Sequence, residues 1–205
     1  MIQQNKIPVG QFFKSIMSTI GTSIKEIIII SLIFSLPGML LGSSNFITSF
    51  LTLLASTVGM LSIIVLVDNK RKGIKLKWFE APKIVMKNPF VPIMVFIVKN
   101  MFVNLGYMVF PLLGQIIVIF LLAALPYAVL EQKNIIESFK LSFNMVKGNF
   151  LDVLLKKLII IIVVNLFIML VGGIFLSNFL ASTFIILINI LMLIPDLILY
   201  YDLKA

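Results

Sequence analysis

A stretch of 41 residues, from 27 to 67, contains no Asp, Glu, Lys or Arg. As an α-helix rising 1.5 Å per residue it would be roughly 62 Å long, about twice the ~30 Å thickness of the hydrocarbon core of a bilayer. The stretch therefore predicts two membrane crossings joined by a tight turn at residues 42–45. Only 12% of the chain is charged and 60% is hydrophobic, whereas soluble domains carry about a quarter charged residues. We expect an integral membrane protein.

Two further blocks extend this pattern. Residues 158–195 are also uncharged, and residues 88–130 contain a single charge, Lys99. Each block is long enough for two crossings. The predicted fold class is therefore all-α integral membrane, with residues 1–205 forming a single transmembrane domain of three helical hairpins. Its six predicted crossings are 27–42, 46–67, 89–107, 111–130, 158–175 and 179–200.

The basic residues predict the orientation of these helices. Sixteen of the 17 fall in segments 1–26, 68–88, 131–157 and the C-terminal tail, which alternate with the predicted hairpins. Cytoplasmic loops are enriched in Lys and Arg, so both termini are expected on the cytoplasmic side. The net charge of +9 is confined to this face. Because long uncharged blocks separate the basic segments, a nucleic-acid partner is not expected.

Each predicted hairpin is preceded by a segment with helical amphipathicity, at residues 10–25, 76–87 and 135–147. Basic amphipathic helices lie at the membrane surface and attract anionic lipid headgroups. The segment 68–88 supports two interpretations. It is either a connector that obeys the positive-inside rule, or a docking face for a cytoplasmic partner or lipid headgroups. The candidate residues of that face are Lys70, Arg71, Lys72, Lys75 and Lys77.

Several kinds of chemistry lack the residues they need. The chain has no Cys and no His, so we expect no disulfide, no thiolate metal site and no catalytic histidine. Sequence motifs for phosphate binding, zinc peptidases and serine hydrolases are absent. Asp196 has no second aspartate within the membrane to form a catalytic dyad. We therefore expect no catalytic residues, no metal and no cofactor.

Polar residues within the predicted crossings are candidates for a solute site. Lys99 falls near mid-membrane, where a charge is costly and suggests function. An inward-reaching Lys99 could meet Asp196 near the cytoplasmic end of the sixth crossing. The alternative is that such groups only form hydrogen bonds between helices. The candidate substrate-binding set consists of Lys99, Asn104, Asn165, Asn189 and Asp196.

Three short stretches and the C-terminus carry a resemblance to a known family. They are Pro126-Tyr127-Ala128-Val129-Leu130-Glu131, Ile136-Glu137-Ser138-Phe139-Lys140-Leu141-Ser142-Phe143, Val146-Lys147-Gly148-Asn149-Phe150 and Leu199-Tyr200-Tyr201-Asp202-Leu203-Lys204. This pattern resembles the bacterial membrane domain of glycerophosphoryl diester phosphodiesterase over roughly residues 110–205. The ending is similar to the family's closing "YYDLR", with Lys204 in place of Arg. The resemblance implies six helices in a bacterial membrane, and it does not support enzymatic activity in this chain.

Three functions are compatible with these features. The first is a non-enzymatic accessory, scaffold or immunity-type component of a transport or secretion system, which acts through another membrane protein or as a homo-oligomer. The second is a transporter or substrate-binding subunit for a small solute or lipid, with a polar site around Lys99. The third, a lipid-processing enzyme, is suggested only by the name of the family.

Overall fold

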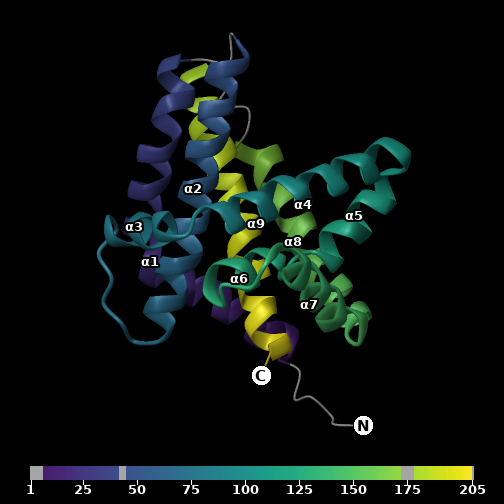
Figure 1. The fold of residues 1–205 in the computed structure, drawn as a ribbon. Helices are drawn as coiled ribbons and strands as arrows, with labels where there is room; N and C mark the ends of the chain where they lie inside the picture. Colours follow the sequence, from purple (N-terminus) through teal and green to yellow (C-terminus); the bar gives the residue numbers. More distant parts are fainter. Residues whose placement is uncertain (1–6, 42–44, 172–177, 205) are drawn as a thin grey trace.

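The computed structural model describes residues 7–41, 45–171 and 178–204, and within them the chain is helical without any strand. Figure 1 shows the helices in sequence order. They are α1 (Val9–Leu41), α2 (Phe46–Arg71), α3 (Glu80–Lys87), α4 (Phe90–Val109), α5 (Pro111–Phe120), α6 (Ala124–Leu130), α7 (Ile135–Lys147), α8 (Phe150–Val171) and α9 (Asn178–Lys204).

Five segments of the described chain are long and apolar enough to cross a membrane: Val9–Gly38, Phe46–Arg71, Phe90–Val109, Pro111–Leu130 and Phe150–Leu170. They confirm the prediction of a multi-pass helical membrane protein. The sixth predicted crossing, 179–200, falls within the 27-residue helix α9. Of the predicted turn at 42–45, residues 42–44 lie outside the described residues, as do residues 172–177 near the turn of the third hairpin. The arrangement as three hairpins stays a prediction.

Helix α1 differs from the sequence prediction, because it is one continuous helix of 33 residues. The predicted interfacial helix 10–25 and the predicted crossing 27–42 are both parts of it. Residues 22–36 include no Gly or Pro, and the charged pair Lys25 and Glu26 consists of good helix formers. Nothing in this region interrupts the helix, so hydropathy changes along α1 without a change in its direction.

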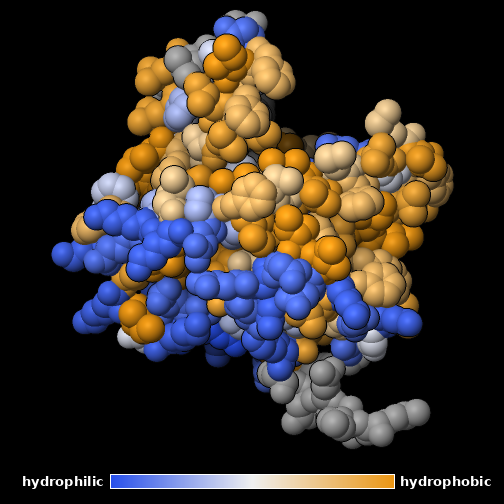
Figure 2. Space-filling model, in the orientation of Figure 1, coloured by the Kyte–Doolittle hydropathy of each residue, from blue (hydrophilic) through white to orange (hydrophobic). Residues whose placement is uncertain are grey.

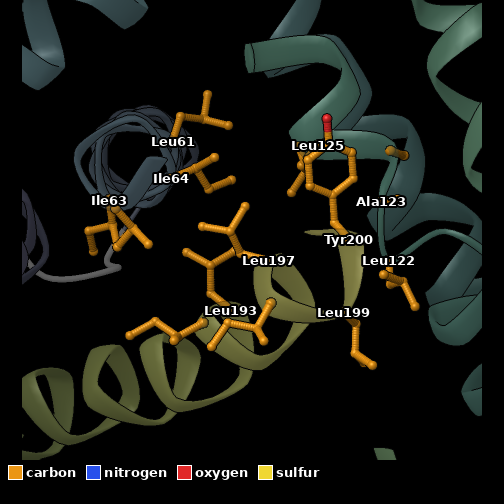
Figure 3. Packing of buried hydrophobic residues seen from close by; sticks show 14 of the residues in the cluster. Leu61, Ile63, Ile64, Leu122, Ala123, Leu125, Leu193, Leu197, Leu199 and Tyr200 are labelled. Carbon is orange, nitrogen blue, oxygen red and sulfur yellow. The ribbon is translucent and has the colours of Figure 1, made fainter. Parts of the chain in front are cut away.

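Helices α1, α2 and α9 stand side by side, whereas the α4–α5 hairpin projects away from them (Figure 1). Figure 3 shows apolar side chains of α2, α9 and residues 122–125 pointing toward one another. Leu61, Ile64 and Leu197 are almost fully buried at this junction. Within a bilayer, such packing stabilises helix association by van der Waals contact, because lipid is as apolar as the core.

The α4–α5 hairpin is held together by a close approach of two glycines. A Cβ atom added at Gly106 would lie 2.6 Å from Ile117 and 3.0 Å from the Cα of Gly114. One added at Gly114 would lie 2.5 Å from the ring of Tyr107. The two helices therefore pack tightly at their connected ends because neither glycine has a side chain.

The predicted crossing 111–130 is interrupted between α5 and α6. Pro126 lacks an N–H group, and its ring would collide with the carbonyl of Leu122 in a continuous helix. Ser142, a fully buried residue of α7, bonds to the groups freed by the break. Its hydroxyl donates to the Phe120 carbonyl at 2.8 Å and accepts from the Ala123 amide at 3.1 Å. Helix α7 occupies the range 135–147, which the sequence predicts to be amphipathic.

Polar and apolar surfaces are separated along the molecule. Figure 2 shows hydrophilic residues gathered in a band over one end, with hydrophobic residues above it and over the α4–α5 hairpin. The start of α1 and the end of α9 both lie at the polar end (Figure 1). The Ile7 amide donates to the Asp202 carboxylate at 3.0 Å, which joins the two ends of the chain.

Replacing Ser142 with Ala is expected to lower the free energy of unfolding by about 2 kcal/mol, since a buried amide and a buried carbonyl lose their partner. The measurement is unfolding of the purified chain in mild detergent. Ser138→Ala is the matched control. Ser138 is equally buried on the same helix but makes one longer bond, of 3.4 Å to the Lys133 carbonyl. Its loss should be under about 1 kcal/mol. Equal losses in the two variants would contradict the role given to Ser142.

Candidate functional site

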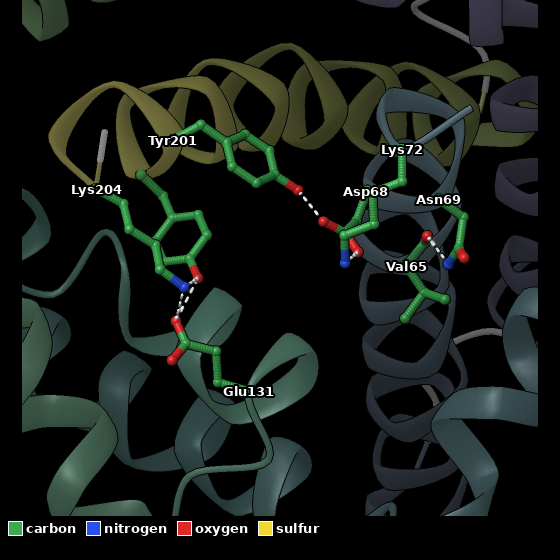
Figure 4. A network of polar contacts seen from close by, with 8 residues as sticks. Val65, Asp68, Asn69, Lys72, Glu131, Tyr201 and Lys204 are labelled. Atoms are coloured by element: carbon green, nitrogen blue, oxygen red, sulfur yellow. Dashed lines mark hydrogen bonds and ion pairs between the residues drawn. The ribbon is translucent and has the colours of Figure 1, made fainter. Parts of the chain in front are cut away.

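The last five residues of α9 contact helices from distant parts of the chain. The Tyr200 hydroxyl donates to Glu131, directly after α6, at 2.5 Å. The Tyr201 hydroxyl donates to Asp68 of α2, also at 2.5 Å. Figure 4 shows α9 reaching toward both partners, with the Tyr201 ring directed at α2. The C-terminal signature is therefore a junction between helices.

Asp202 of the same segment forms an ion pair with Lys156 of α8, with 2.7 Å between the charged atoms. A second carboxylate, Asp152, lies 2.8 Å from the same ammonium group, one helical turn earlier in α8. The Lys156 side chain is 0% exposed, and its ammonium group lies 5.6 Å from the centre of the Phe12 ring. A cation withdrawn from solvent to this extent requires such partners, because an unpaired buried charge is strongly destabilising.

A second buried pair lies beside the first. Lys157 of α8 forms an ion pair with Asp196 of α9, and both side chains are largely buried. Lys99 of α4 is half-buried and interacts electrostatically with both members of this pair, attracted by Asp196 and repelled by Lys157. Among the described residues, no ion pair joins Lys99 to a carboxylate. The partner of Asp196 is thus Lys157, where the sequence suggested Lys99.

Glu131 and Lys204 complete the junction at the surface. Their charged atoms are 2.7 Å apart, and Lys204 also lies 3.2 Å from the Tyr200 hydroxyl. Partial burial raises the pKa of Glu131. The hydrogen bonds from Lys204 and Tyr200 outweigh that effect and hold the pKa below the ordinary value. Glu131 is consequently a carboxylate at neutral pH.

The predicted docking residues occupy the end of α2 and the loop after it, but they differ in their surroundings. Lys70 is engaged, at 2.8 Å from Glu26 and 2.7 Å from the Thr22 carbonyl of α1. The Arg71 guanidinium lies 4.0 Å from the centre of the Tyr201 ring, a cation–π contact. Lys72 pairs with Asp68 at 2.5 Å. Lys75 and Lys77 are exposed, and neither forms an ion pair within the described chain.

The predicted substrate-binding residues are distributed over three helices. Asn104 is an exposed residue of α4. Asn165 is exposed on α8, and its amide donates to the Ile161 carbonyl of its own helix at 2.7 Å. Asn189 belongs to α9, and its side chain lies outside the described residues. The structure brings Lys99 near Asp196, and a common binding site for the whole set stays a prediction.

The burial of Lys156 and Lys157 was not predicted from the sequence, because they precede the uncharged stretch that begins at residue 158. The two lysines were counted with the cytoplasmic segment 131–157, but α8 begins at Phe150 and includes both. One feature of the sequence does indicate that Lys156 has an acidic partner on a helix. Asp152 and Lys156 are four residues apart, the spacing that brings opposite charges together on a helix.

In the described part of the chain, no three His, Cys, Asp or Glu residues lie close enough together to hold a metal ion. Beside the junction, the exposed residues Arg71 and Lys75 offer hydrogen-bond donors and positive charge. Such groups can bind an anion or an acidic partner.

The fold is that of a multi-pass helical membrane domain, and comparison with known families specifies which one. A family model described as the membrane domain of glycerophosphoryl diester phosphodiesterase matches residues 91–201, just over half of the chain. The chain belongs to this family. The resemblance inferred from the sequence is confirmed. The match begins earlier than expected, in α4, and ends at Tyr201, before Asp202. No curated protein and no solved structure matches.

Replacing Lys156 with Met is expected to lower the free energy of unfolding by about 3–5 kcal/mol, because Asp202 then stays buried without its cation. The double variant Lys156→Met/Asp202→Leu should recover most of that loss, since an apolar pair carries no desolvation cost. Unfolding in detergent measures both. A double variant as unstable as the single one would contradict a pairwise role.

The lowered pKa of Glu131 predicts a pH effect on stability. A carboxyl whose pKa is lower in the folded state stabilises the fold above its ordinary pKa of about 4.5, and this contribution is lost as pH falls through the folded value. Wild type should therefore be more stable than Glu131→Gln at pH 7, with the difference shrinking below about pH 4.5. Glu137→Gln is the control, because Glu137 is exposed and has no ion pair among the described residues. A difference that does not change with pH would contradict this prediction.

Proposed function

We propose that this chain is a non-enzymatic membrane protein that acts through partners, as an accessory, scaffold or immunity-type component of a transport or secretion system. Its proposed location is the bacterial cytoplasmic membrane, with both termini in the cytoplasm. The observation that carries the proposal is the projecting α4–α5 hairpin with its largely hydrophobic surface (Figures 1 and 2). Helix α4 of this hairpin includes an exposed polar residue, Asn104.

The surface around Asn104 supports a protein partner over lipid alone. Met101 and Met108 lie three and four residues away, on the same face of α4, and are 58% and 82% exposed. The Asn104 side chain makes no hydrogen bond within the described residues. An amide group facing hydrocarbon has no partner, whereas an Asn facing another helix forms an interhelical hydrogen bond. A helix of a second membrane protein, or of a second copy, would satisfy this amide.

The positions of the buried carboxylates also favour a structural protein over an enzyme. Asp196 and Asp202 are each held by a lysine of α8, and the chain contains no His or Cys. A carboxylate that is held in a buried ion pair is occupied by its lysine and is not free to act on a substrate. The charges inside the helix bundle are thus used to hold α8 and α9 together.

A transporter or solute-binding subunit is the second candidate. Lys99 favours it, since this residue lies in the middle of α4, in the field of Asp196, and forms no ion pair with a carboxylate in the described part of the chain. A small anionic or zwitterionic solute could use Lys99 as its counter-ion. If Lys99→Leu leaves both folding and any measurable transport unchanged, this second candidate is excluded.

The partner proposal predicts a position-dependent crosslink. A photo-crosslinking residue at Met101 should capture a protein in intact cells, identified by mass spectrometry. Ile162 on α8 provides the matched control, because it is also 58% exposed and lies a similar number of residues into its helix. In the Met101 background, Asn104→Leu should lower the yield about five-fold, which corresponds to one interhelical hydrogen bond of about 1 kcal/mol. Equal protein capture at the two positions, or lipid adducts alone at Met101, would contradict the proposal.

A further inference from the structure

A cavity of about 580 Å³ lies between α1, α2 and α9, next to the C-terminal junction. Helix α1 contributes a row of hydroxyl groups to its wall, α2 and the following loop contribute cations, and α9 contributes Tyr201. The end of α2 and the end of α9 both lie at the polar end of the molecule (Figure 1). The cavity is therefore at the level where membrane headgroups would lie if α1 and α2 cross the bilayer.

The loop that closes the cavity is formed by a defined helix ending. The Gly73 amide donates to the Lys70 carbonyl at 3.0 Å, and the Ile74 amide donates to the Asn69 carbonyl at 2.9 Å. This pair of bonds is the Schellman motif, in which the residue after the helix adopts a left-handed conformation. Gly73 does so, with φ +76°. The turn directs residues 74–76 back over the cavity and places Lys75 on its wall.

Three cations and one carboxylate line the cavity, so its charge is positive. Lys70 neutralises the carboxylate, Glu26, at 2.8 Å. Arg71 is held over the Tyr201 ring, and its guanidinium forms no ion pair with any carboxylate that the structure describes. Lys75 is exposed and likewise forms no ion pair among the described residues. The charge of Arg71 and Lys75 is available to a ligand.

Ser23 of α1 provides an independent indication of a ligand. The residue is 1% exposed and lines the cavity, and its hydroxyl has no hydrogen-bond partner in the described structure. Buried polar groups almost always have such partners. The hydroxyl groups of Ser18 and Thr19 line the same wall of α1. An acceptor-rich anion in the cavity would accept a hydrogen bond from Ser23 and pair with Arg71.

We propose that this cavity binds a phosphate group, carried by the headgroup of an anionic phospholipid or present as free phosphate. Phosphate oxygens are strong acceptors, and Arg binds them in a two-pronged geometry. The apolar parts of a lipid have a surface to follow, because Ile29 and Ile33, three and seven residues beyond Glu26 on the same face of α1, are each 37% exposed. Most residues that line the cavity precede residue 91, where the family match begins. The site is thus built largely from the part of the chain outside that match.

The test uses the purified full-length chain in mild detergent, titrated with dioleoylphosphatidylglycerol and followed by native mass spectrometry. Arg71→Gln/Lys75→Gln should weaken lipid binding by about 30-fold, the loss expected for two cations at a membrane surface. Ser23→Ala should weaken it by several-fold. The matched control is Lys83→Gln/Lys87→Gln, which removes two exposed cations of α3 outside this cavity and should leave affinity unchanged.

Competition with sodium phosphate identifies the source of the phosphate group. If phosphate displaces the lipid in wild type but not in Arg71→Gln/Lys75→Gln, the site binds free phosphate. If it does not displace the lipid, the headgroup is the ligand. Equal weakening in the cavity and control variants would overturn the proposal, as would no weakening in either. Lys75→Gln alone keeps the test valid if the Arg71 variant fails to fold, because Lys75 has no ion pair to lose.

Discussion

The buried ion pair between Asp202 and Lys156 is the interaction on which the polar end of this protein depends. The Lys156 side chain is 0% exposed and that of Asp202 is 2% exposed, so neither charge can be left without the other. The pair connects α9 to α8, and Asp202 also accepts a hydrogen bond from Ile7, just before α1. The two ends of the chain and the start of α8 therefore meet at one carboxylate.

The residues beside Asp202 extend this junction to other helices. Tyr200 contacts Glu131 and Tyr201 contacts Asp68, so successive side chains of α9 point to different neighbours (Figure 4). The hydrogen bonds of Ser142 have the same effect at the break between α5 and α6. Residues that form a family signature in sequence are thus contacts between helices here. Among the described residues, the α4–α5 hairpin and the cavity beside Arg71 are two surfaces that stay open for binding.

Much of the fold was predictable because hydropathy and charge are local properties. Uncharged stretches indicated the long helices, and the amphipathic pattern at 135–147 indicated α7. The structure adds a cap to α7, where the Asn134 side chain accepts from the Glu137 amide. The predictions failed where a residue's environment depends on distant partners. Lys156 was counted in the cytoplasmic segment 131–157 and its burial was not predicted, because its carboxylate partner Asp202 lies 46 residues further along the chain. Asp196 is a similar case, since its ion-pair partner is Lys157, 39 residues before it in the chain, and not Lys99.

The sequence by itself determined the class of the protein, its helical membrane character and its family. These follow from properties of contiguous segments: length without charge, amphipathic periodicity and short motifs. Only the tertiary structure decided which lysines are buried and which stay exposed. It also brought hydroxyl groups of α1 to the same cavity as the cations at the end of α2 and in the loop after it. A cavity wall built from α1, α2 and α9 exists only when these helices pack, because its polar groups come from three separate parts of the chain, between Ser18 and Tyr201.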